Sequence, residues 1–87
     1  MGLSGKVCII TGGGSGIGKA TALQMASEGA IVALVGRTLS KVDAVKTEIK
    51  ASGGRAESYA INVADKKSVS AMVTRLFKKY GTIDVLL

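Results

Sequence analysis

Residues 11–18 read TGGGSGIG, and five of these eight residues are glycine. The run KVCIIT at residues 6–11 precedes them and predicts a buried strand, because it is short, apolar and β-branched. Ile17, Ala20, Thr21 and Gln24 then follow at helical spacing, up to a stop at Gly29. A glycine loop between a strand and a helix offers backbone N–H groups and the helix dipole to a phosphate. The stretch therefore predicts a phosphate-binding turn.

The same alternation of strand and helix continues to the end of the sequence. A capping-box-like pair, Ser40 and Asp43, predicts the start of a second helix, and Asp65 predicts the cap of a third. Glycines at 53–54 and at 81 end these helices. Further strands are predicted over residues 30–35, 56–63 and 83–87. This order, without proline or a linker, predicts right-handed crossovers in one parallel α/β sheet, and one domain over residues 1–87.

Charge and composition narrow the function classes. The chain has 87 residues, 47% of them hydrophobic and 21% charged, as expected of a globular domain. The formal net charge is +6, which raises the question of a nucleic-acid partner. No recognition motif accompanies the charge, and the basic residues fall on the polar sides of two predicted helices. We therefore expect solvated helix faces and no nucleic-acid partner; these residues are Lys41, Lys46, Lys50, Lys66, Lys67, Arg75, Lys78 and Lys79.

The single cysteine and the short apolar runs bear on the cellular location of the protein. Cys8 is the only cysteine and stands in the apolar run of the first strand, which predicts a small buried side chain rather than a reactive thiol. The longest apolar runs, such as residues 30–35, are too short to cross a bilayer, and the first residues lack a signal-peptide pattern. We expect a cytoplasmic protein with no membrane partner.

The spacing of the glycines separates three nucleotide-binding motifs. With Gly12 as the first glycine of G-x-G-x-x-G, Ile17 falls where the last glycine is required. Residues 13–20 are one residue from a P-loop, but Ala20 lacks the hydroxyl that would hold Mg²⁺. A degenerate P-loop NTPase remains as a less favoured alternative. The loop does satisfy every position of T-G-x-x-x-G-I-G.

On this motif the sequence resembles the classical short-chain dehydrogenase/reductase family, of which it looks like the N-terminal part. The resemblance covers the whole chain and implies a Rossmann-like doubly wound parallel sheet, here its N-terminal half, forming a single, incomplete dinucleotide-binding domain over residues 1–87. It implies that Asn62 and Val63 flank the adenine, although the family more often has Asp at position 62. The residues implied to wrap the cofactor pyrophosphate are Gly12, Ser15, Gly16, Ile17 and Gly18.

The residues after the second strand favour NADP(H) over NAD(H). A nicotinamide dinucleotide site commonly has an acidic residue here to hold the ribose hydroxyls, but this sequence has Gly36. Arg37 follows, and its guanidinium fork suits a 2′-phosphate. Thr38 can add a hydroxyl and Lys41 a further charge.

The catalytic groups that the resemblance implies, a Tyr-x-x-x-Lys pair assisted by Ser and Asn, have no counterpart in this sequence. Tyr59 is followed four residues later by Val63, and Tyr80 by Asp84. With no histidine and one cysteine, neither a Ser-His-Asp triad nor an ordinary zinc site is expected. We therefore expect no catalytic and no metal-binding residue here.

Two functions remain. In the first, the chain is the NADP(H)-binding part of an oxidoreductase that transfers hydride between the nicotinamide and a carbonyl or secondary alcohol. That small-molecule substrate would be bound only by a longer chain, and these 87 residues alone would be inactive. In the second, the chain is a non-catalytic nucleotide-binding or interaction module. Either way, the open edge of the last strand and the open helix faces predict marginal stability or self-association.

Overall fold

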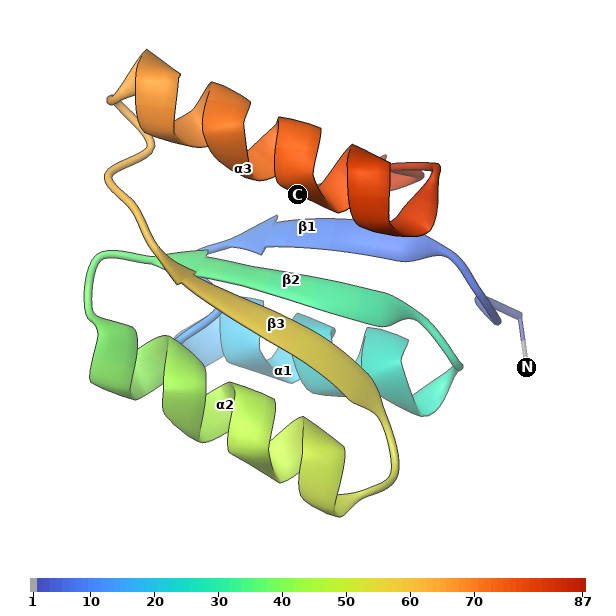
Figure 1. Cartoon of the computed structure of the whole chain (residues 1–87). Coiled ribbons are helices and arrows are strands. Elements are labelled where there is room, and N and C mark those ends of the chain that lie inside the picture. The colour runs from blue at the N-terminus through green and yellow to red at the C-terminus, as the bar shows by residue number, and fades with distance from the viewer. Residues whose placement is uncertain (1) are drawn as a thin grey trace.

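All seven predicted elements form, in the predicted order. The computed structural model describes residues 2–87, and Figure 1 shows strands and helices alternating along the chain. The elements are β1 (Val7–Thr11), α1 (Gly16–Ser27), β2 (Ile31–Gly36), α2 (Leu39–Ala51), β3 (Arg55–Ala60), α3 (Lys66–Tyr80) and β4 (Val85–Leu86).

The four strands form one parallel sheet in the order β3-β2-β1-β4. In Figure 1, α3 lies above the sheet, whereas α1 and α2 lie below it. The helices α1 and α2 each connect neighbouring strands, whereas α3 crosses the sheet from β3 at one edge to β4 at the other. Both faces of the sheet are therefore covered, as parallel sheets require. The Rossmann-like doubly wound arrangement predicted from the sequence is confirmed.

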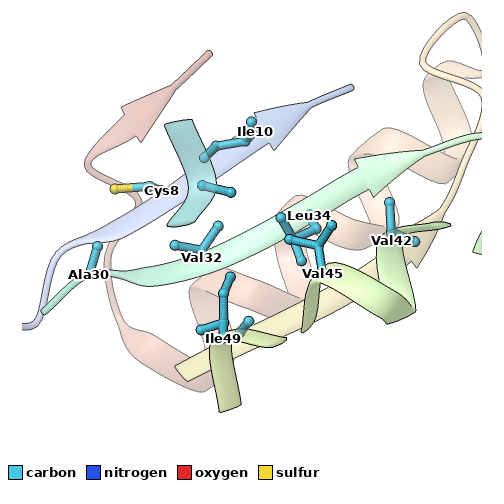
Figure 2. Close-up of a cluster of buried hydrophobic side chains, with 10 residues drawn as sticks. Cys8, Ile10, Ala30, Val32, Leu34, Val42, Val45 and Ile49 are labelled. Atoms are coloured by element: carbon cyan, nitrogen blue, oxygen red, sulfur yellow. The ribbon is translucent and has the colours of Figure 1, made fainter. Parts of the chain in front are cut away.

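Side chains from alternate strand positions build a core on each face. Cys8, Ile10, Val32 and Leu34 point toward α1 and α2 (Figure 2) and pack with further buried residues, Ala22, Ala30, Val42, Val45, Ile49 and Ala56. On the other face, Ile9, Ala33 and Val35 pack with Met72 and Leu76 of α3. Because β1 and β2 are buried on both faces, their apolar runs are continuous rather than alternating.

Cys8 is fully buried, as its place in the first strand predicted. Burial, and secondarily the negative charge of Asp84, raises the pKa of its thiol. The thiolate is the reactive form of cysteine, so this side chain behaves as a structural residue.

Three predicted boundaries are wrong by two residues or more; one is the start of the fourth strand, which begins at Val85 rather than at residue 83. The N-cap of α2 is Thr38, not Ser40, and the Asp43 carboxylate accepts a hydrogen bond from the Ser58 hydroxyl of β3 instead of completing a capping box. The third strand ends at Ala60, not at residue 63. Asn62 turns the chain there, because its Oδ1 accepts from Ala64 N–H at 2.9 Å in an Asx-type turn.

The other helix signals are confirmed. The Asp65 carboxylate accepts from the backbone N–H groups of Lys67 and Ser68 and caps α3. Gly81 ends α3 in the left-handed conformation, with φ of 79°. The apolar face of α3 is only partly buried, because Met72 and Leu76 are buried but Phe77 is 57% exposed. Within residues 2–87, no helix has the length and apolar character needed to cross a membrane.

Candidate functional site

The glycine loop is tied to the carboxyl end of β2. The N–H groups of Gly12 and Gly13 both donate to the Val35 carbonyl oxygen, at 2.8 and 3.3 Å. Gly12 has φ of 69° and Gly16 has φ of 57°, a backbone conformation that residues other than glycine rarely adopt. The carboxyl ends of β1 and β2 thereby form one surface, which is where parallel α/β sheets bind ligands.

Gly18 sets how closely α1 approaches the end of β1. A Cβ atom at this position would lie 2.1 Å from the Gly12 carbonyl oxygen, a backbone atom that cannot move aside. Glycine at position 18 is therefore required for packing. In contrast, a Cβ atom added at Gly12 or Gly16 would meet nothing within 4 Å, so the backbone of the loop is open to a ligand.

The N-terminus of α1 has no partner from its own side chains. Ser15 is the N-cap in an extended conformation, and its hydroxyl makes no cap hydrogen bond. The first turn contains no acidic residue. The first N–H groups of a helix lack partners within the helix and carry its positive dipole. Together with the open loop, this end of α1 fits the pyrophosphate of a dinucleotide.

A cavity of about 250 Å³ joins this loop to the start of α2. Four of the predicted site residues line it, namely Gly12, Ser15, Arg37 and Thr38, together with Gly14, Gly36, Lys41 and Val42. Two of the lining side chains are cations and none is a carboxylate. The cavity is therefore suited electrostatically to a group carrying several negative charges.

The packing around Gly36 leaves little room for a side chain. A Cβ atom there would lie 2.9 Å from Cγ1 of Val42, whose side chain is fully buried against the sheet. An acidic side chain at this position would press on a branched residue that cannot swing away. Packing at the end of β2 therefore favours glycine at position 36 on steric grounds. Glycine there also leaves no negative charge next to Arg37.

The remaining predicted residues do not line the cavity. Gly16, Ile17 and Gly18 begin α1, and the Ile17 side chain is 87% exposed. Asn62 and Val63 are exposed in the loop after β3. This loop starts next to the end of β2, because Ile61 N–H donates to the Gly36 carbonyl oxygen at 2.9 Å.

Sequence reasoning did not assign Gly14 a role. A Cβ atom on Gly14 would lie 2.9 Å from Cβ of Lys41, so this glycine lets the loop approach α2. The glycine itself was visible in the sequence. Its contact with a residue 27 positions later was not, because that contact depends on how α2 packs.

Comparison with known proteins identifies the chain's relatives. Residues 6–87 match the family described as short chain dehydrogenase. The chain is 43% identical over 86 residues to a 3-oxoacyl-[acyl-carrier-protein] reductase of Thermotoga maritima, covering 99% of this chain and 35% of that protein.

Solved structures agree. A metagenomic short-chain oxidoreductase in complex with NADP is 41% identical, with a TM-score of 0.94 over 99% of this chain and 39% of that one. An NAD⁺-bound xylitol dehydrogenase is 34% identical, with a TM-score of 0.92 over 99% of this chain and 33% of that one. The chain thus spans somewhat over a third of the reductase that it matches and a similar share of these structures. On the matched residues, the chain belongs to the short-chain dehydrogenase family of oxidoreductases, and its fold is the nucleotide-binding fold of that family.

Proposed function

We propose that this chain is the NADP(H)-binding part of an oxidoreductase that transfers hydride between the nicotinamide and a carbonyl or secondary alcohol. The observation that carries the proposal is the cavity shared by the glycine loop and Arg37, which contains two cations and no carboxylate. NADP(H) carries one more phosphate than NAD(H), so a cavity of this charge favours it.

The pyrophosphate would lie on the loop and the first turn of α1. In this arrangement Gly12, Gly16 and Gly18 allow close approach of the backbone, and the N–H groups near Ile17 donate to the phosphate oxygens. Ser15 adds its hydroxyl, which is not engaged in capping the helix. The helix dipole adds to the attraction.

The 2′-phosphate would lie between the end of β2 and the start of α2. Arg37 offers two parallel N–H donors, the geometry that holds a phosphate in bidentate fashion. The Thr38 hydroxyl and the Lys41 ammonium line the same cavity and would add a neutral donor and a second charge.

The adenine would lie beside Asn62 and Val63. Oδ1 of Asn62 already accepts from Ala64 N–H, so its amide nitrogen remains as the group that can donate to a ring nitrogen. Val63 is 57% exposed and offers an apolar contact to a flat ring.

The relatives support a reaction of this kind. The Thermotoga protein is described as a reductase of a 3-oxoacyl group, and two similar structures contain NADP and NAD⁺. NADP(H), when bound, supplies or accepts the hydride. In our proposal this chain binds and orients NADP(H). The residues that bind the substrate and move the proton would be part of a longer chain. A cytoplasmic location suits the reduced, buried thiol of Cys8.

The test is titration of the chain with NADPH and with NADH, followed by nicotinamide fluorescence or calorimetry. We expect NADPH to bind more tightly. Replacing Arg37 by Gln should weaken NADPH binding by about tenfold or more, since it removes a charge-assisted contact, and should change NADH binding by less than about threefold.

The matched control is Arg55→Gln, which removes the same charge at the opposite end of the sheet, on the first residue of β3. It should leave both affinities within about twofold. Tighter binding of NADH by the original chain, or an equal loss of both cofactors on Arg37→Gln, would contradict the assignment of Arg37.

A further inference from the structure

A second recess of the molecule lies along the edge of the sheet, away from the candidate cofactor cavity. β3 ends the strand order and pairs only with β2. Figure 1 shows β3 nearest the viewer, between α3 above and α2 below. A groove of about 400 Å³ follows this edge, lined by residues of all three elements. The outer backbone groups of an edge strand are able to pair with a further strand.

Five cations line the groove. Lys46 and Lys50 come from α2, Arg75 and Lys79 come from α3, and Arg55 comes from β3 itself. Within each helix the two cations are four residues apart, a spacing at which like charges repel and cost helix stability. Both helices therefore direct repelling pairs toward the same strand edge.

The one carboxylate of the groove is already engaged. Oε2 of Glu57 accepts from Lys79 Nζ at 2.7 Å and from the Tyr80 hydroxyl, while Oε1 accepts from the Tyr59 hydroxyl at 2.7 Å. The other four cations form no ion pair within the part of the chain that the structure describes. Five cations against one carboxylate leave the groove strongly positive.

We propose that the β3 edge binds an extended acidic peptide segment of a partner protein, added as a strand along residues 55–60. The strand edge supplies hydrogen bonds to a peptide backbone, and the two rows of helix cations supply charge complementarity for acidic side chains on either side. A second copy of this chain does not fit, because the same five cations would face each other across the new pair of strands. A nucleic acid would satisfy the charges but not the N–H and C=O groups of the edge.

The experiment uses two dye-labelled octapeptides and fluorescence anisotropy at low salt. One, the Glu-Val peptide, repeats Glu-Glu-Val-Val, so that acidic side chains lie on both faces of an added strand. The other has the same sequence with every backbone amide N-methylated, so it has the same charge but cannot donate the backbone hydrogen bonds of an added strand. We expect the Glu-Val peptide to bind about tenfold more tightly or better, and to shift the amide NMR signals of residues 55–60. Its binding should weaken as salt is added.

Two double variants with the same change in net charge locate the site. Lys46→Glu with Lys50→Glu reverses the α2 side of the groove, and Lys66→Glu with Lys67→Glu reverses two lysines at the start of α3, which do not line it. We expect the first to weaken the Glu-Val peptide by about tenfold and the second by less than about threefold. If the first double variant unfolds the chain, Lys46→Gln with Lys50→Gln takes its place. This variant neutralises the two charges without reversing them, and we expect the same weakening.

NADPH titration of the same variants separates this proposal from the proposed function, because neither lysine pair lines the cofactor cavity. Equal binding of the two peptides, equal losses in both double variants, or tighter binding of a thymidine oligonucleotide than of the Glu-Val peptide would overturn the acidic-strand proposal. In those cases the cations only protect the strand edge or attract polyanions in general.

Discussion

Gly18 is the residue on which the packing of the glycine loop depends most directly. In an ordinary helix Gly→Ala is stabilising by about 1 kcal/mol. Here the new Cβ atom would lie 2.1 Å from the Gly12 carbonyl oxygen. We expect Gly18→Ala to lower the free energy of unfolding by about 1–3 kcal/mol, measured by urea denaturation, because a backbone shift is the only relief. It should also weaken NADPH binding.

Gly53→Ala is the control for Gly18→Ala, since it places a methyl group in open space at a residue with φ of 86°. It carries the strain of the left-handed conformation without the clash, and so should cost about 1 kcal/mol and leave cofactor binding unchanged. A Gly18→Ala chain more stable than the original would show that helix propensity outweighs the contact.

At the scale of the element, the helices α1 and α3 differ in how they begin. Asp65 caps α3 through two backbone N–H groups, whereas the Ser15 hydroxyl makes no cap bond in α1. We expect Asp65→Ala to lower the thermal midpoint by about 4–8 °C, and Ser15→Ala to change it by much less, as measured by circular dichroism. If the two replacements had equal effects, the cap of α3 would not be the stabilising contact.

The strand β3 is anchored to α3 through Glu57. Burial acts to raise the pKa of this carboxyl, but hydrogen bonds from Lys79, Tyr80 and Tyr59 outweigh it and lower the pKa from an ordinary value of 4.5 to about 2. A lowered pKa in the folded state stabilises the fold above about pH 4.5, and this contribution disappears as pH falls toward 2.

Glu57→Gln should therefore reduce the free energy of unfolding at neutral pH by about 1–3 kcal/mol and flatten its decline between pH 4.5 and pH 2. Urea denaturation over this range measures both effects. Glu48→Gln is the control, because the Glu48 side chain is 51% exposed and 4.0 Å from Lys19 Nζ. Its replacement should change the stability at neutral pH by less than about 0.5 kcal/mol.

At the scale of the whole molecule, net charge and apolar exposure act against each other. The chain carries a formal charge of +6, while Val73 and Phe77 leave an apolar strip of α3 partly exposed. We expect weak self-association that increases with salt, because screening reduces the repulsion between copies. Sedimentation velocity at low and high salt measures it.

Phe77→Ser should reduce this self-association, whereas Leu39→Ser, at a residue on α2 that is 51% exposed, should not. An unchanged monomer at all concentrations and salt levels would contradict the expectation. The salt dependence is opposite in sign to that of the acidic peptide at the β3 edge, so the two associations are distinguishable.

The sequence by itself determined the order of elements, the parallel α/β class and the position of the glycine loop. Each of these follows from local signals: apolar runs long enough for buried strands, a glycine cluster at a strand end, and caps such as Asp65 and Gly81 that act within four residues. Arg37 and Thr38 were proposed as site residues in the same way, because they directly follow a recognisable strand, and both line the cavity beside the glycine loop.

Only the tertiary structure decided which distant residues meet. The start of α2 was misplaced because Asp43 had a partner, Ser58, in a strand whose position the sequence does not specify. The contact of Gly14 with Lys41 and the groove shared by α2 and α3 likewise depend on the strand order β3-β2-β1-β4. Helical periodicity places each lysine on a polar face. It does not reveal that two such faces border the same strand edge, because that depends on how the whole sheet is assembled.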